Sequence, residues 1–201
     1  MRPRISSLTL DCHNELEGRM DMDKVIGELK RTRGSIGSHS FPKKSGIYAL
    51  FLKKGSDLKG YTVPDDNLIY IGSTDNLAER AQENHFNSDS TGFSTLRRTI
   101  GAIMKEVFSL KSIPRSHGIS ETNYKNYKFI ATGERLLTDW MRNNLEIGYY
   151  SVFEDYEKIE KEMLKSLRPI LNLKGCDNHY KKQIMALRKI CSEEAKRNRA
   201  V

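Results

Sequence analysis

The chain has 201 residues, of which 37% are hydrophobic and 30% are charged, and its formal net charge is +8. A chain of this length is expected to form one domain with extensions and to bury a core without a disulfide or metal scaffold. No run approaches the roughly 20 apolar residues of a spanning helix, which argues against an integral membrane protein. The basic balance permits a polyanion partner but does not establish one.

The three cysteines are Cys12, Cys176 and Cys191. An odd number at scattered positions predicts neither a disulfide framework nor a zinc site. The first residues contain no apolar stretch of the length that a secretory signal needs. We therefore expect a reduced protein in the cytoplasm.

The first half of the chain predicts a helix followed by two strands. Val25, Ile26 and Leu29 share one face of a helix over residues 22–33, which Asp21 or Asp23 could cap. Residues 34–40 are rich in Gly and Ser and are expected to form a loop or linker. Residues 45–52 and 68–72 are short, β-branched and aromatic, which predicts two strands that pair as an antiparallel hairpin.

The second half alternates helices and strands. Asp75 or Asn76 could cap a helix through residue 86, and apolar residues from Leu96 to Val107 recur at helical spacing. Residues 112–126 are expected to be irregular. Further predicted elements are a strand at 128–131, a helix at 134–145 with Leu136, Leu137 and Trp140 inward, a strand at 147–153, a helix at 156–167 and a basic amphipathic helix at the C-terminus. This order predicts an α+β fold with a small, mainly antiparallel central sheet flanked by helices.

Two tripeptides on the predicted hairpin, Gly46-Ile47-Tyr48 and Tyr70-Ile71-Gly72, resemble the signature of the GIY-YIG nuclease superfamily. An arginine, Arg80, follows ten residues after Tyr70, as the pattern of that family requires. Glu160, with a proline nine residues later and Asn172 three after that, resembles the C-terminal motif of the family. The resemblance covers residues 44–174 as a nuclease domain. Residues 1–43 form an N-terminal arm outside it, and residues 175–201 a basic helical tail.

The sequence departs from the family pattern in two respects. Many members carry a histidine four residues after the arginine, whereas here that position is Asn84 and His85 comes one residue later. Either His85 takes the role through a slightly shifted helix, or the role is absent. The stretch between Arg80 and Glu160 is also lengthened, at 94–104 and 108–150, which indicates a subgroup variant.

The resemblance implies a set of catalytic residues. Glu160 would bind one Mg²⁺ or Mn²⁺, because such an ion needs few protein carboxylates. Tyr48 would activate or orient water beside Tyr70, although a free phenol with a pKa near 10 is a poor base. Arg80 would bind phosphate through its planar fork, His85 would donate or relay a proton, and Asn172 would orient the site. Each of these residues could instead have only a structural role, in core packing, in surface ion pairs or in a turn.

Basic residues could add contacts to DNA. Lys44, Arg97, Arg98 and Lys105 are candidates to follow the phosphate backbone. Residues 174–201 hold eight Lys and Arg against three acids and so carry +5 of the net +8; the candidates there are Lys181, Lys182, Arg188 and Lys189. The same pattern is typical of solvated charges and of an amphipathic helix docked on the core.

The predicted function is a divalent-metal-dependent DNA endonuclease, either of restriction type or a repair or mobile-element nuclease. A protein with one active site that cuts both strands would act as a homodimer. The alternatives are a non-catalytic nucleic-acid-binding protein that retains the fold, and an interaction domain with no nucleic-acid role, because a fold does not fix a function.

Overall fold

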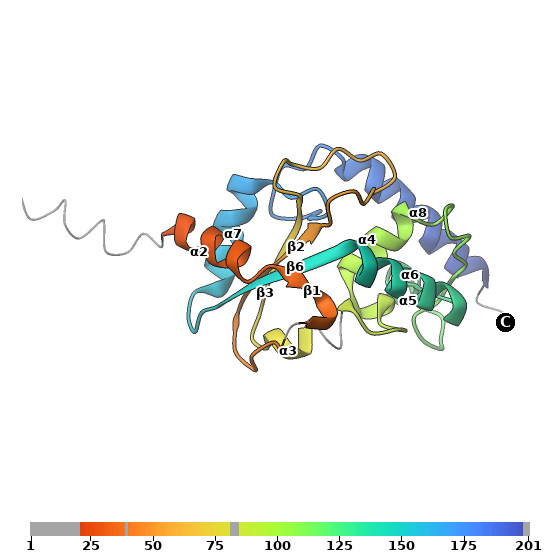
Figure 1. Ribbon diagram of the computed structural model, residues 1–201. Coiled ribbons are helices and arrows are strands. Elements are labelled where there is room, and N and C mark those ends of the chain that lie inside the picture. The colour runs from red at the N-terminus through yellow and green to blue at the C-terminus, as the bar shows by residue number, and fades with distance from the viewer. Residues whose placement is uncertain (1–20, 39, 81–84, 199–201) are drawn as a thin grey trace, which may run out of the picture.

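The protein, described here as a computed structural model over residues 21–38, 40–80 and 85–198, is built around an antiparallel sheet (Figure 1). Its strand order is β1-β6-β2-β3, and all three pairings are antiparallel. The strands are β1 (Gly34–Ser35), β2 (Gly46–Leu52), β3 (Leu68–Thr74) and β6 (Leu145–Ser151). This arrangement confirms the predicted α+β fold and the predicted pairing of the two tripeptide strands.

The central strand β2 is buried along its whole length because its side chains alternate between two core layers. Ile47, Ala49 and Phe51 pack into one layer. Tyr48, Leu50 and Leu52 pack into the other. A strand that is apolar on both faces needs a cover on each side, and helices supply both covers.

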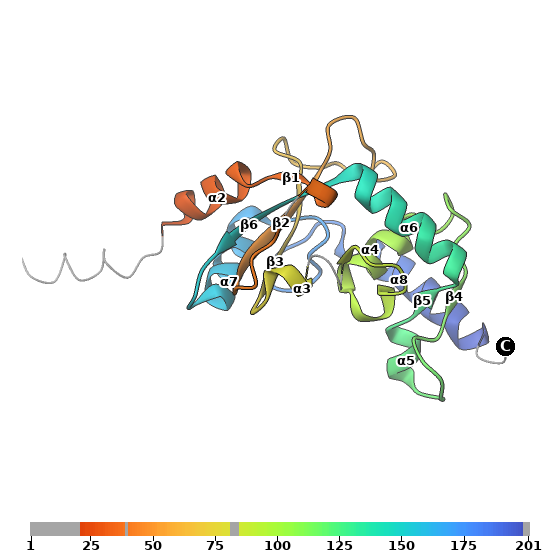
Figure 2. The same ribbon diagram turned by 60° about the horizontal axis from the view of Figure 1, so that its bottom comes forward.

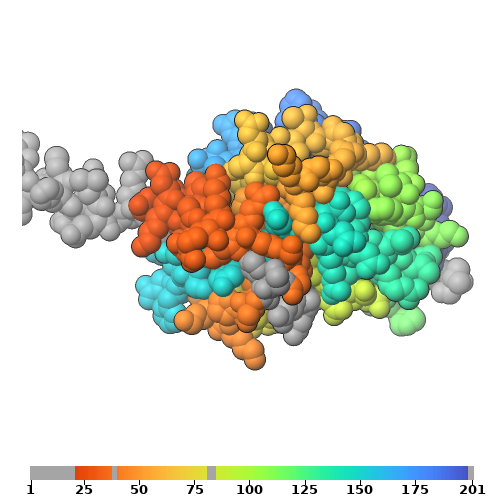
Figure 3. Space-filling view, viewed as in Figure 1, coloured from red at the N-terminus to blue at the C-terminus, as the bar shows by residue number. Residues whose placement is uncertain are grey.

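Helices α2 (Met22–Arg31) and α7 (Tyr156–Leu167) cover the first face. The second layer includes α4 (Thr95–Ile103), α6 (Ala131–Asn144) and α8 (Lys181–Arg197). Figures 1 and 2 show these two groups of helices on opposite sides of the sheet. The long connection from β2 to β3, coloured orange to gold, lies on the surface in Figure 3.

A bulge shifts the pairing of β2 with β3. Leu50 pairs with Tyr70, but Phe51 pairs with Leu68, so Ile69 is the extra residue on β3. A bulge interrupts the strict alternation of faces: the consecutive residues Ile69 and Tyr70 both belong to the layer of Tyr48. Because Tyr70 pairs with Leu50 and Ile71 pairs with Ala49, Tyr70 faces the same layer as Tyr48, and Ile71 faces the opposite one.

Side-chain caps begin several helices where the sequence indicated. Asp21, one of the two predicted caps, accepts from the backbone N–H groups of Asp23 and Lys24 at 3.1 Å each. Asn76 caps α3 (Leu77–Glu79), and the remainder of the helix predicted there includes residues 81–84, which lie outside the described part of the chain. Ser94 caps α4.

The chain between Arg80 and Glu160 contains a second, two-stranded sheet of β4 (Ser112–Ile113) and β5 (Lys128–Phe129). Ser120 caps a short helix, α5 (Glu121–Lys125), between these strands. Residues 112–126 therefore contain regular elements where an irregular stretch was expected. Short 3-10 turns, η1 (Ile36–Ser38) and η3 (Thr91–Phe93), complete the elements.

Both flanking segments pack on the predicted nuclease domain. In the arm, β1 pairs with β6 at the edge of the sheet, through Gly34 opposite Ile147. In the tail, Ile184 and Cys191 of α8 are fully buried in the second core layer. The division into arm, domain and tail stays a prediction, but these contacts bind all three parts into one core.

One predicted inward residue was wrong: Leu136 on α6 is 48% exposed, whereas its neighbour Leu137 is fully buried. Cys176 and Cys191 are free thiols. Within residues 21–38, 40–80 and 85–198, every helix is too short or too polar to cross a bilayer.

Candidate active site

The two motif tyrosines lie side by side on one face of the hairpin. The ring centroids of Tyr48 and Tyr70 are 6.1 Å apart. Gly72 pairs with Tyr48 across the strands, and a Cβ at Gly72 would lie 2.4 Å from the Tyr48 hydroxyl oxygen. The last glycine of the second tripeptide therefore makes the space that the Tyr48 ring fills.

His85 is hydrogen-bonded to Tyr48. Its Nε2 lies 2.8 Å from the Tyr48 hydroxyl, and its Nδ1 lies 2.9 Å from Oγ of Ser94. Burial lowers the pKa of His85 to about 3, and the nearby charges of Arg80 and Arg97 act in the same direction. The imidazole is therefore neutral at physiological pH. The structure brings the histidine at the shifted position to Tyr48; Asn84 lies outside the described residues.

The pKa values of the two phenols are raised above that of a free tyrosine. Burial raises the pKa of Tyr48 well above 10, and it raises the pKa of Tyr70 as well. The Glu160 carboxylate adds to the rise in both pKa values, and the Arg80 guanidinium opposes it. Both phenols are thus protonated at neutral pH, and both lie within the field of the same carboxylate and the same cation.

Arg80 follows α3 and has a buried Nε without a hydrogen-bond partner among the described residues. A buried donor left unpaired costs about 1–3 kcal/mol. Such a donor is satisfied when an acceptor such as a phosphate oxygen binds. The guanidinium fork suits that ligand because it presents several N–H groups in one plane.

The side chains of Glu160 and Asn172 both form hydrogen bonds with β3, at the residues after and before Gly72. Glu160, on α7, accepts a hydrogen bond from the Ser73 hydroxyl. The Asn172 side chain accepts from the Ile71 N–H at 2.9 Å and donates to the Ile71 carbonyl at 2.8 Å. Asn172 therefore braces the strand that carries Tyr70, and Glu160 is held at the end of that strand.

A cavity of about 360 Å³ opens beside these residues. It is lined by Arg80 together with residues that sequence reasoning did not select: Ser73, Thr74, Asp75, Asn76, Glu79, Tyr156 and Glu157. Their only signal in the sequence is that they adjoin the motif residues. The cavity gives a substrate access to Arg80 and to the end of β3.

The donors present suit a hard divalent cation. Glu160 is a half-buried carboxylate, and the Ser73 hydroxyl adjoins it. Within the described ranges there is no cluster of three or more His, Cys, Asp or Glu able to hold a metal. A carboxylate beside a hydroxyl offers the oxygen ligands that hard divalent cations take, rather than the nitrogen and sulfur ligands of a structural zinc site.

Residues 46–190, more than half of the chain, match the family model of the GIY-YIG catalytic domain. The chain belongs to the GIY-YIG family of nucleases. Comparison with curated proteins and with solved structures gives no significant match. Members of the GIY-YIG family generally use divalent metals, in agreement with the oxygen donors around Glu160.

Two of the arginines expected to contact DNA are internal to this GIY-YIG fold. Arg97 is 0% exposed and forms an ion pair at 2.7 Å with Glu134, which is also fully buried. Arg98 is buried and donates to the carbonyls of Thr91 and Gly92 at 3.1 and 2.8 Å. The prediction that Arg97 and Arg98 follow a DNA backbone is wrong, because both guanidinium groups are buried and their terminal Nη1 and Nη2 nitrogens donate to protein acceptors.

The other predicted DNA contacts differ in exposure. Lys105 is held by Glu194 at 2.6 Å and by the Leu110 carbonyl, which leaves it poorly placed for phosphate. Arg188 is half-buried. The remaining predicted side chains are exposed: Lys44, Lys181, Lys182 and Lys189.

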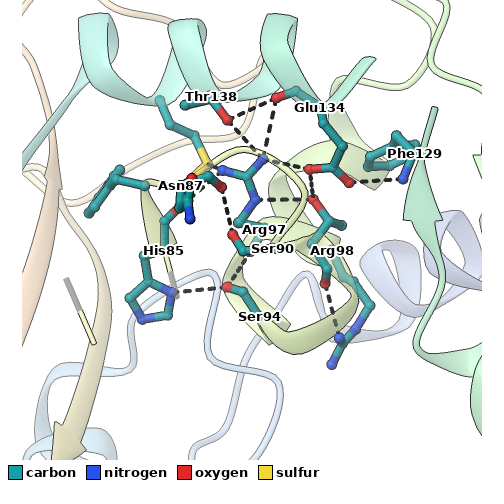
Figure 4. Close-up of polar contacts among 12 residues, drawn as sticks. His85, Asn87, Ser90, Ser94, Arg97, Arg98, Phe129, Glu134 and Thr138 are labelled. Carbon is teal, nitrogen blue, oxygen red and sulfur yellow. Dashed lines mark hydrogen bonds and ion pairs between the residues drawn. The ribbon is translucent and has the colours of Figure 1, made fainter. Parts of the chain in front are cut away.

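The buried Arg97 instead supports the segment that carries His85 (Figure 4). Its guanidinium donates to the His85 carbonyl at 3.1 Å, and to Thr91 and Thr138 at 3.0 and 2.9 Å. Glu134 also accepts from Thr91 at 2.7 Å. No local pattern signals this network, because Arg97 and Glu134 are 37 positions apart in the chain.

Proposed function

We propose that this GIY-YIG protein is a divalent-metal-dependent DNA endonuclease that hydrolyses phosphodiester bonds. The observation that carries the proposal is geometric: His85 is hydrogen-bonded to Tyr48 beside Tyr70, and Ser73, near the end of β3, bonds Glu160 and lines a cavity together with Arg80. Hydrolysis needs an activated water, a cation for the phosphoryl oxygens and a route for the proton, and these residues are suited to supply all three.

Tyr48 and His85 form the proton route in this proposal. Because the pKa of Tyr48 is high, its phenol is protonated when water binds. The Tyr48 oxygen takes a proton from water while the phenolic proton moves toward Nε2 of His85 along the hydrogen bond between them. Because the low pKa of His85 disfavours a lasting imidazolium, that proton returns through Tyr48 and is released to solvent. The hydroxide attacks phosphorus, the bond to the leaving oxygen breaks, and a solvent water protonates that oxygen.

Arg80 and Glu160 act on the phosphate. The unpaired Nε of Arg80 would donate to a phosphoryl oxygen, which gains charge during attack. Glu160 would hold Mg²⁺ or Mn²⁺, and a bound divalent ion neutralises charge on the phosphoryl oxygens. Asn172 acts by holding β3 in place and does not touch the substrate.

The test is incubation of the full chain with supercoiled plasmid in Mg²⁺ or Mn²⁺, with and without EDTA. We expect nicked or linear DNA with either metal, and no product with EDTA or with Glu160→Ala. The matched control is Glu162→Ala, because Glu162 is an exposed carboxylate on the same helix. It should cut as the parent does.

Two outcomes would reject this function. Cleavage by Glu160→Ala at the parental rate would show that the Glu160 carboxylate takes no part in the reaction. Tight, salt-sensitive DNA binding without product in any divalent metal would favour the non-catalytic binding protein instead. A restriction-type role, with site-specific fragments from a homodimer, and residence in the cytoplasm stay predictions.

A further inference from the structure

Phe153 is the most exposed large hydrophobic side chain of the described residues, at 88%. Covering a phenylalanine of this size is worth about 1.5–3 kcal/mol, so the fold leaves a substantial apolar surface in water at this point. The residue belongs to the loop between β6 and α7.

The loop lies at the rim of the candidate active site. Ser45, which precedes β2, donates to the carbonyl of Val152 at 2.7 Å and accepts from its N–H at 3.1 Å. Ser151 and Thr74 both pair with Gly46, and Thr74 lines the active-site cavity. Figure 3 shows the cyan β6–α7 segment beside the orange entry to β2, at the lower left.

The same loop leads directly into the cavity wall. Tyr156 begins α7 and lines the cavity, three residues after Phe153. Asp155 has a positive φ of 58°, in the left-handed region, which turns the chain between the two residues. Phe153 is therefore tied to the site on one side by Ser45 and on the other by α7.

The charges around Phe153 indicate what it contacts. Lys43 and Lys44 are exposed next to Ser45, and Glu154 and Asp155 are exposed on the loop itself. The carboxylates disfavour a phosphate next to the ring, and the lysines favour one on the Ser45 side. A DNA strand that crosses this loop would therefore place its phosphates at the lysines and a base at the ring, whose flat face is suited to stacking.

A protein partner fits this surface less well. Among residues 21–38, 40–80 and 85–198, the other large hydrophobics that are more than half exposed lie on separate parts of the fold: Phe93, Val107, Ile119 and Ile190. A specific protein interface buries about 1,200–2,000 Å² around a contiguous apolar core, which a lone ring flanked by charges does not provide. Insertion of a single apolar wedge at a base step is, by contrast, a common way to hold DNA.

We propose that Phe153 stacks on a nucleobase of the bound DNA, next to the phosphate that is cut, while Lys43 and Lys44 bind flanking phosphates. This inference rests on the proposed function. It assigns to the β6–α7 loop a contact with the bases that is separate from the catalytic residues.

The experiment measures binding of a fluorescein-labelled duplex by full-length protein carrying Glu160→Ala, in Mg²⁺, so that cleavage does not interfere. Adding Phe153→Ala should raise Kd by about 5- to 100-fold, because stacking contributes about 1–3 kcal/mol per base. Phe153→Trp should retain parental binding, and Phe153→Leu should recover only part of it. The matched control is Ile119→Ala, which removes an 82% exposed apolar side chain on the β4–α5 connection and should leave Kd unchanged.

A second readout reports stacking itself. In duplexes scanned with 2-aminopurine, binding of the Phe153 protein should change the fluorescence at one position, and Phe153→Ala should abolish that change. The inference is overturned if Phe153→Ala and Ile119→Ala have equal Kd values and Phe153→Ala keeps the fluorescence change. Plasmid cleavage by the parent would still support the nuclease function in that case. Failure of the parent to bind any duplex would overturn both.

Discussion

Arg80 and Arg97 lie on either side of His85 in the sequence, and their guanidinium groups have different surroundings in the structure. Arg97 is fully buried, and its donors meet Glu134, two threonine hydroxyls and the His85 carbonyl. Arg80 borders a cavity, and its buried Nε has no acceptor among the described residues. A guanidinium whose donors meet protein acceptors in the core holds the protein together, whereas an unpaired donor at the wall of a cavity can bind a ligand there.

The two regions also depend on each other. Arg97 holds the backbone of His85, while the charges of Arg80 and Arg97 both help to keep the imidazole neutral. The buried pair therefore supports the site without touching a substrate. Substitution in the buried pair should therefore lower the stability of the protein, whereas substitution of Arg80 should lower its activity.

The largest expected effect is on stability, from Glu134→Ala. This substitution leaves the Arg97 charge buried without its partner, and it should lower the free energy of unfolding by about 3–5 kcal/mol. Urea denaturation followed by circular dichroism measures the change. The double variant Arg97→Met/Glu134→Leu should recover most of the loss, because neither charge then remains buried; a double variant as unstable as the single one would contradict this account.

The next effect is on the rate, from Arg80→Ala. Loss of a donor to the phosphoryl oxygens should lower kcat for plasmid cleavage by about 10²–10³-fold. The free energy of unfolding should stay the same or rise, because an unpaired buried donor is removed. Arg135→Ala, at an exposed position on α6, is the matched control and should cut normally. If Arg80→Ala instead loses stability and keeps its rate, Arg80 is a structural residue like Arg97.

The smallest effect, taken for a change of one pH unit, is the pH dependence that His85 contributes. Its pKa is about 3 in the folded protein and near 6.5 when unfolded, so the unfolded state binds the extra proton between these values. Stability should therefore fall as the pH drops from 6.5 toward 3, by up to about 1.4 kcal/mol per pH unit from this group. Urea denaturation of the parent and of His85→Gln at several pH values measures it. The difference in stability between the two proteins should shrink as the pH falls, and a constant difference would show that His85 is not kept neutral.

Local sequence determined the elements around the site. The strands predicted at 45–52 and 68–72 correspond to β2 and β3, and Asp21 and Asn76, each one of two predicted caps, begin their helices. These features follow from short-range rules of strand packing and helix capping. The tripeptide motifs identified the family for the same reason, because they lie within single strands.

Contacts between distant residues were decided only by the tertiary structure. The Arg97–Glu134 pair spans 37 positions, and β1 joins the sheet through β6, more than 100 positions away. A local pattern does not distinguish an arginine that meets a buried carboxylate from one that faces solvent. The same limit explains why Leu136 was expected inside and lies outside.

The sequence by itself determined the hairpin, the helix starts and the GIY-YIG motifs, because each depends on residues close together in the chain. Only the tertiary structure decided that His85 contacts Tyr48 despite its shifted position, that Arg97 is internal, and that Phe153 lies exposed at the rim of the site. Those outcomes depend on which distant side chains meet when β2, β3, β6 and the helices pack, since burial and partners are properties of the assembled core.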